Sequence, residues 1–153
     1  MIFTGCLKTP VGYLKIEADE ESLLEVDLIE SAVTERNNDI TEEAKKQLRE
    51  YFSGKRRSFD LPIRYETTPF RKRIYDALRN VPYGSTVSYR DLTYMAGNRH
   101  GFQATGQAMH HNRLMIIVPC HRVINSDGSL GGYGRHTEAK KYLLNMEAGR
   151  EIW

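Results

Sequence analysis

The stretch Pro119-Cys120-His121-Arg122-Val123 places a thiol next to an imidazole, directly after an apolar run over 114–118. A thiol attacks as its thiolate, and at an ordinary pKa of about 8.5 only a small fraction is ionised near neutral pH. An imidazole within reach can accept the thiol proton and so create a nucleophile. Pro119 cannot continue a central strand, so the chain is expected to turn at Cys120. The pattern predicts a cysteine nucleophile with His121 as its base. The alternative is a buried structural cysteine beside a surface histidine.

The composition limits the class of protein. The chain has 153 residues, of which 40% are hydrophobic and 27% charged, enough for one ordinary domain or two small ones. No apolar run approaches the roughly 20 residues of a membrane span, and the N-terminus lacks the features of a signal peptide. Two cysteines, Cys6 and Cys120, cannot form a disulfide scaffold, which favours a reducing cytoplasm. No metal site is predicted, because CxxC and HExxH spacings are absent.

Charge is distributed unevenly between the two halves of the chain. Residues 1–63 carry 9 Lys and Arg against 13 Asp and Glu, a net charge of −4. Residues 64–153 carry 13 against 7, a net charge of +6, together with all five histidines. A basic C-terminal part indicates contact with a polyanion such as DNA. Ordinary solvated charge is the alternative explanation.

Residues 1–63 are predicted to form a small antiparallel sheet with one helix. Apolar residues alternate with polar ones over 14–18 and again over 24–28, which is typical of half-buried strands joined by a turn at 19–22. A helix is expected to begin near Thr41, as a possible N-cap, and to end at Gly54. Its apolar face would hold Ala44, Leu48, Tyr51 and Phe52.

Residues 64–153 are predicted to form a second, mainly helical domain, so the fold class is α+β. Thr68-Pro69 is typical of a helix start. Ser88 can cap a short helix, and a second short helix fits 102–111 after a glycine-containing turn. Two such helices resemble a helix-turn-helix, with a plain helical hairpin as the alternative. The last helix is expected to begin near Thr137, with an apolar stripe of Ala139, Tyr142, Leu143 and Met146.

Three local features add to this picture. The segment 103–108 has small side chains, which permit close approach to a minor groove only about 6 Å wide, or else tight helix packing. The glycines around Tyr133 predict a loop whose backbone can lie against a flat ligand, although no phosphate-binding motif is present. Glu147 falls at the edge of the last helix's apolar stripe, where a carboxylate can orient a histidine or remain solvated.

As an ordered set these residues resemble the O6-alkylguanine-DNA alkyltransferases, repair proteins that take an alkyl group from guanine onto a cysteine. The resemblance covers most of residues 64–153 and implies a winged helix-turn-helix there, preceded by a small sheet-containing domain. Its motifs, in chain order, are Val87-Ser88-Tyr89, Ala108-Met109 with Asn112, Ile117 to Val123, Gly132-Tyr133, and Leu143-Leu144 with Glu147.

The resemblance implies a role for each catalytic residue. Cys120 would be the alkyl acceptor, His121 would be its base directly or through a water, and Glu147 would orient that histidine. Asn112 would tie the recognition helix to the active-site loop. Tyr89 would donate a hydrogen bond to N3 of guanine. The flipped-out base would also meet the backbone carbonyl of Val123, together with Tyr133 and the Gly134 amide. Gly134 replaces a serine found in many relatives.

The resemblance also implies a DNA-binding surface. The expected contact residues are Gln103, Ala104, Thr105, Gly106, Arg99, Arg113 and Arg122. The family usually carries an arginine at the position of Gln103, where it fills the hole left by the flipped base. Glutamine lacks that charge and stacking plane.

The expected function is therefore direct-reversal DNA repair with one turnover per molecule. The substrate would be double-stranded DNA carrying O6-alkylguanine, with O4-alkylthymine as a second candidate. A cytoplasmic monomer without cofactor or metal is expected. One alternative is a non-catalytic protein that binds alkylated DNA, although such relatives replace the acceptor cysteine. The other is a Cys-His hydrolase, which would not explain the helix-turn-helix.

Overall fold

A computed structural model describes residues 1–131 and 136–153. The described residues form two compact units. The first contains Met1–Glu66 and Arg113–Ile117, and the second contains Thr67–Asn112 and Val118–Trp153. The α+β class predicted from the sequence is confirmed.

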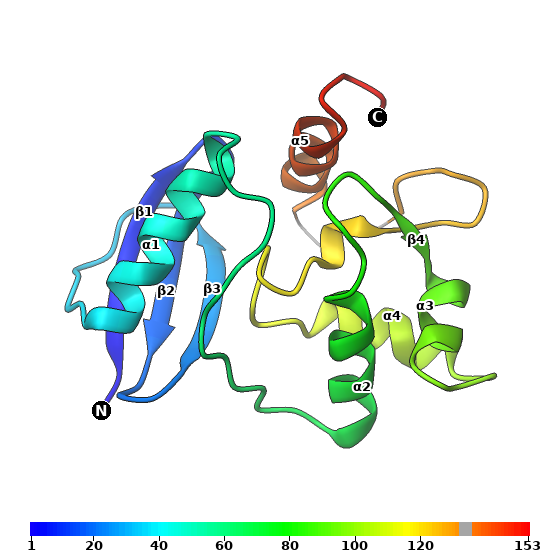
Figure 1. Cartoon of the computed structure of the whole chain (residues 1–153), viewed down its shortest axis with the longest axis horizontal. Helices are drawn as coiled ribbons and strands as arrows, with labels where there is room; N and C mark the ends of the chain where they lie inside the picture. The colour runs from blue at the N-terminus through cyan, green and yellow to red at the C-terminus, as the bar shows by residue number, and fades with distance from the viewer. Residues whose placement is uncertain (132–135) are drawn as a thin grey trace. The chain divides into compact units, whose positions relative to one another are not determined.

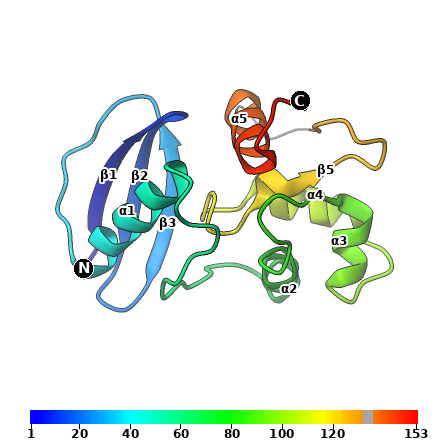
Figure 2. The same ribbon diagram turned by 45° about the horizontal axis from the view of Figure 1, so that its top comes forward.

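The first unit is built on a three-stranded antiparallel sheet in the order β1-β2-β3. The strands are β1 (Phe3–Thr9), β2 (Gly12–Ala18) and β3 (Leu23–Ile29). The predicted alternation is visible in the register, where Ile16 pairs with Val26 and both side chains are buried. Helix α1 (Asp39–Phe52) lies across one face of the sheet, so the core of this unit forms between helix and sheet (Figures 1 and 2).

The start of α1 differs from the expectation. Asn38, not Thr41, is the N-cap: its side chain accepts a hydrogen bond from the Thr41 amide at 2.9 Å. The Thr41 hydroxyl in turn accepts from the Asn38 amide at 2.9 Å, which completes a capping box. Both residue types can cap a helix, so the sequence alone did not separate them.

The segment Arg113–Ile117 returns to the first unit late in the chain. Leu114 forms a parallel bridge with Val26 of β3. The Val26 amide donates to the Arg113 carbonyl at 2.9 Å, and the Met115 amide donates to the Val26 carbonyl at 3.1 Å. The apolar run before Cys120 therefore satisfies its backbone at the edge of the sheet.

The second unit contains α2 (Pro69–Leu78), α3 (Tyr89–Met95), α4 (Phe102–His110) and α5 (Thr137–Ala148). The side chains of Thr68 and Ser88 accept from backbone amides at the starts of α2 and α3, as the sequence predicted. The two short helices α3 and α4 follow each other across a short turn (Figure 1). A buried hydrogen bond of 2.7 Å between the hydroxyls of Thr93 and Thr105 fixes this pair.

Two very short strands bring distant parts of the second unit together. Strand β4 (Val87–Ser88) pairs in parallel with β5 (Val123–Ile124), so Val87 lies opposite Val123. Because β4 runs directly into α3 and β5 follows the Cys120 turn, this pairing brings the start of α3 beside that turn.

Helix α5 buries a different set of residues from the predicted stripe. Ala139 and Leu143 are buried as expected, but Tyr142 is 40% exposed. Leu144 and Lys140 are buried in its place. Across the described ranges, every helix is too short or too polar to span a lipid bilayer.

Candidate active site

The predicted nucleophile lies in a single turn of 3-10 helix, Cys120–Arg122. Pro119 precedes it and ends the apolar run, as the sequence indicated. The Cys120 amide donates to the Val118 carbonyl at 2.8 Å, and the Arg122 amide donates to the Pro119 carbonyl at 2.9 Å. The tight turn holds Cys120 in a buried position, with a side chain shielded from bulk water.

His121 and Glu147 form a buried pair, although 26 residues separate them. The His121 Nε2 atom lies 2.7 Å from Glu147 Oε2. Burial by itself would raise the pKa of Glu147, but hydrogen bonds and charge from His121 and Arg122 lower it far below its ordinary range. The carboxylate is therefore ionised and can only accept hydrogen bonds, so His121 Nε2 carries the proton that it donates.

This arrangement determines the chemical state of His121. Burial lowers the pKa of His121 below 6.5, while the hydrogen bond that His121 donates to Glu147 acts in the opposite direction. The imidazole is then neutral at pH 7, with its lone pair on Nδ1. That atom is buried and has no hydrogen-bond partner among the described residues. A neutral imidazole oriented in this way can serve as a proton acceptor.

Asn112 contacts the nucleophile itself. Its Nδ2 atom donates to the Val118 carbonyl at 2.9 Å and to Cys120 Sγ at 3.2 Å. A donor to sulfur stabilises a thiolate more than a neutral thiol. Asn112 follows α4, so it links that helix to the Cys120 turn.

Tyr89 begins α3, next to the paired strands β4 and β5. Burial and then the negative charge of Cys120 raise the pKa of the Tyr89 phenol above 10.0. The phenol therefore stays protonated at neutral pH and remains a hydrogen-bond donor. The pairing of β4 with β5 places the start of α3 near the Cys120 turn.

Lys140 is a member of this site that the sequence did not reveal. Its ammonium group is fully buried and donates to the Val123 carbonyl at 2.7 Å. Burial lowers the pKa of Lys140 to about 8, and the negative charge of Cys120 acts in the opposite direction. The only signal available was its place between Ala139 and Leu143, on the buried side of α5.

Three predicted DNA-binding residues lie elsewhere than expected. Arg122 is buried, with Nε donating to Glu147 Oε1 at 2.8 Å and Nη1 donating to the Val81 carbonyl at 2.8 Å, so it does not face DNA. Thr105 is buried against Thr93. Arg113 belongs to the first unit, where it forms ion pairs with Glu25 and Glu66. Burial leaves little of the Arg122 and Thr105 side chains for DNA, whereas the Arg113 side chain is 48% exposed and its contact with DNA stays a prediction.

The remaining predicted DNA-binding residues lie on the outside of the α3–α4 pair. Gln103 and Ala104 in the first turn of α4 are exposed, as is Arg99 in the preceding turn. Gly106 is half-buried, and an added Cβ there would meet no atom within 4 Å. This face of α4 is therefore slim, and other macromolecules can approach its backbone closely.

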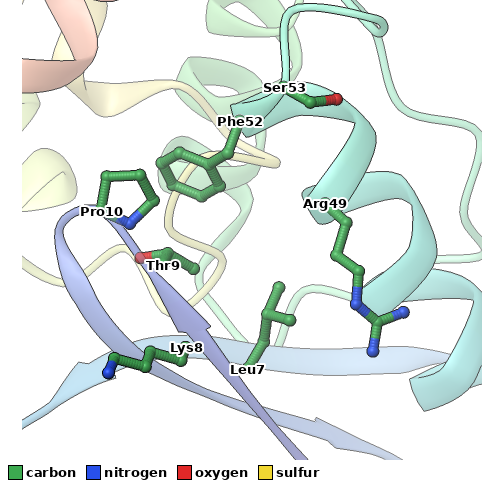
Figure 3. Close-up of a pocket in the computed structure, with 7 residues that line it drawn as sticks. All are labelled: Leu7, Lys8, Thr9, Pro10, Arg49, Phe52 and Ser53. Carbon is green, nitrogen blue, oxygen red and sulfur yellow. The ribbon is translucent and has the colours of Figure 1, made fainter.

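Tyr133 and Gly134 lie outside the described residues. Within residues 1–131 and 136–153, no group of three His, Cys, Asp or Glu side chains is placed to hold a metal ion. One surface cavity of the first unit is lined by Leu7, Lys8, Thr9, Pro10, Arg49, Phe52 and Ser53 (Figure 3). None of the predicted site residues contributes to it.

Comparisons with known proteins agree with the geometry. A family model described as "6-O-methylguanine DNA methyltransferase, DNA binding domain" matches residues 69–149, and its "ribonuclease-like domain" counterpart matches residues 2–65. The chain is 40% identical over 151 residues to the constitutive methylated-DNA–protein-cysteine methyltransferase of Bacillus subtilis, and the match covers 92% of each chain.

Solved structures are also similar. The chain resembles the crystal structure of Mycobacterium tuberculosis O6-methylguanine methyltransferase with a TM-score of 0.88 and 32% identity, covering 99% of this chain and 96% of that one. The same protein in complex with DNA matches with a TM-score of 0.86 and 33% identity, covering 95% and 92%.

Proposed function

The chain belongs to the 6-O-methylguanine DNA methyltransferase family, and we propose that it repairs alkylated DNA directly, by moving an alkyl group from O6 of guanine to Cys120 Sγ. The observation that carries the assignment to this cysteine is its setting. Its sulfur accepts a hydrogen bond from Asn112, and the adjacent His121 is held by the buried carboxylate of Glu147.

The first step is formation of the thiolate. His121 accepts the Cys120 proton at Nδ1, directly or through a water, while Nε2 keeps its proton and its hydrogen bond to Glu147. The imidazolium that forms is stabilised by the ionised Glu147. The hydrogen bond from Asn112 and the positive charge of Lys140 both favour the sulfur anion.

The second step is an in-line displacement. The thiolate attacks the alkyl carbon, an S–C bond forms, and the bond from that carbon to O6 breaks with its electron pair passing to the purine. Tyr89 donates a hydrogen bond to N3 of guanine as this negative charge develops. The proton that His121 took from Cys120 passes through water to the departing guanine anion, so guanine is restored and the imidazole is neutral again. The product is a thioether, which no group in this site can hydrolyse, so each molecule reacts once.

Recognition of guanine uses the backbone around the nucleophile. The Val123 carbonyl has a second lone pair beside the one that accepts from Lys140, and this lone pair accepts from the exocyclic amine of guanine. From the resemblance to the family, we also propose that Tyr133 and the Gly134 amide contact the base near O6. O4-alkylthymine is a second candidate substrate, without the amine contact.

The substrate is double-stranded DNA, bound by a monomer in the cytoplasm. The O6 atom is stacked inside the duplex, so the nucleotide must be flipped out before it reaches a buried cysteine. The exposed face of α4, with Gln103, Ala104 and Gly106, supplies the close contact with the groove.

A transfer assay tests this function. A duplex with one O6-[methyl-³H]guanine is mixed with excess protein, and the label is followed into protein and solvent. We expect label on protein in equimolar amount, with guanine restored in the DNA. Binding without transfer would support a non-catalytic damage-binding protein, and release of label into solvent over many turnovers would support a hydrolase.

A further inference from the structure

Three of the large hydrophobic side chains that are exposed among the described residues gather at one turn. Tyr94 and Met95 end α3 with half of each side chain exposed, and Phe102 begins α4 with 40% exposed. The rings of Tyr94 and Phe102 lie 5.8 Å apart at 80°, an edge-to-face contact. We call Tyr94 and Phe102 the aromatic pair.

The aromatic pair is not part of the core that holds α3 and α4 together. That role belongs to other side chains of the two helices, namely the buried Leu92, Thr93, Thr105 and Ala108. In an edge-to-face contact, each ring leaves at least one face uncovered by the other. A fixed, exposed aromatic surface of this kind on a small domain indicates a binding site.

The chemistry around the aromatic pair indicates a nucleic acid as its occupant. Asp91 is exposed one turn before Tyr94 on α3, but the chain contains no Asp or Glu over residues 92–126. The turn that joins the two helices exposes Arg99 and His100, and Gln103 is exposed next to Phe102. Aromatic rings interleaved with basic residues are typical of surfaces on which bases stack.

We propose that the aromatic pair inserts at the flipped-out site of duplex DNA, where Phe102 stacks on a base that loses its neighbour and Tyr94 supports the Phe102 ring. This inference rests on the proposed function, because the gap exists only when a nucleotide is extruded. Flipping breaks base stacking, and apolar side chains inserted from the minor groove can replace part of it. Gln103 can form amide hydrogen bonds but has no flat apolar face on which a base could stack. Its neighbour Phe102 has such a face.

The test compares two substrates that share the chemical step. Single-turnover rates are measured with a duplex carrying O6-methylguanine and with the free base O6-benzylguanine, which needs no flipping. Duplex affinity is measured separately by fluorescence anisotropy, with 2-aminopurine beside the lesion to report stacking. The variants are Phe102→Ala, Phe102→Trp and Tyr94→Ala. Tyr142→Ala is the matched control, because Tyr142 is an equally exposed aromatic residue on α5.

We expect Phe102→Ala to lower the duplex rate or affinity about tenfold. Phe102→Trp should retain the duplex rate and affinity of the wild type, and Tyr94→Ala should have values between those of the wild type and Phe102→Ala. All variants should react with the free base at the wild-type rate. The proposal is overturned if Phe102→Ala has the same duplex rate and affinity as Tyr142→Ala, a result that would favour a protein partner for this surface. It is also overturned if Phe102→Ala lowers the rate with the free base as much as the rate with the duplex. A wild type that transfers no alkyl group from either substrate would instead refute the proposed function, and the anisotropy would still test the aromatic pair.

Discussion

Replacing Glu147 by Gln removes one negative charge from a buried cluster that contains a cation. Glu147 accepts from His121 Nε2 at 2.7 Å and from Arg122 Nε and Nη2 at 2.8 and 3.1 Å. Breaking a buried ion pair from one side costs about 3–5 kcal/mol, and we expect the lower end because the amide still accepts one hydrogen bond. With a urea m value of about 2 kcal/mol/M, the unfolding midpoint should fall by roughly 1.5 M.

The same substitution acts on chemistry. Without the carboxylate, the imidazolium that forms when His121 accepts the Cys120 proton loses its partner, so the single-turnover rate at pH 7 should fall about ten- to a hundredfold. The rate should partly recover at high pH, where the thiol ionises without a base. A merely destabilised fold would not produce this pH dependence.

The measurement is a pH series of transfer rates at a temperature where both proteins are folded, together with urea unfolding. Glu138→Gln is the control, since Glu138 lies exposed in the first turn of the same helix. If Glu147→Gln has the same urea midpoint and the same transfer rates as Glu138→Gln, the buried cluster contributes neither to stability nor to catalysis as described.

Three further predictions concern neighbouring groups. Burial lowers the pKa of Lys140 from 10.5 to about 8, so between these pH values the unfolded chain binds the proton more fully than the folded protein. The free energy of unfolding of the wild type should therefore rise with pH over this range relative to that of Lys140→Met. Urea melts that give parallel pH curves for the two proteins would contradict this. Asn112→Ala removes the donor to Cys120 Sγ and should slow transfer about tenfold in single-turnover assays, and an unchanged rate would show that the contact is only structural. Duplex affinity should fall with salt, with roughly −0.9 in the slope of log K against log salt for each phosphate contact, and a flat titration would refute the electrostatic role of residues 64–153.

The parts of the fold that local sequence encodes were predictable. Alternating residues gave β2 and β3, and Thr68 and Ser88 marked the starts of α2 and α3, because strand period and helix caps depend on near neighbours. The return of 113–117 to the first unit was not predicted, since a short apolar run does not identify the strand edge that it joins.

The site residues also separate into those that local sequence reveals and those that only the tertiary fold explains. The thiol of Cys120 and its neighbour His121 stand out as a motif. Helical spacing placed Glu147 at the edge of the apolar stripe but did not decide whether its carboxylate is buried or solvated. Arg122 looked like a phosphate contact because charge alone says nothing about burial, and only the tertiary fold brings Glu147 and the Val81 carbonyl to its guanidinium. Lys140 was overlooked for the opposite reason, because a lysine in a buried position needs partners that sequence does not show.

Peptide mass spectrometry after reaction with alkylated duplex tests the central claim most directly. The protein has two cysteines, of which Cys6 lies in β1 and Cys120 is next to His121. We predict one added alkyl group per molecule, found on the peptide that contains Cys120, with Cys6 unmodified and no transfer to a Cys120→Ala variant that still binds DNA. Alkyl on Cys6, or transfer that survives in Cys120→Ala, would contradict the account.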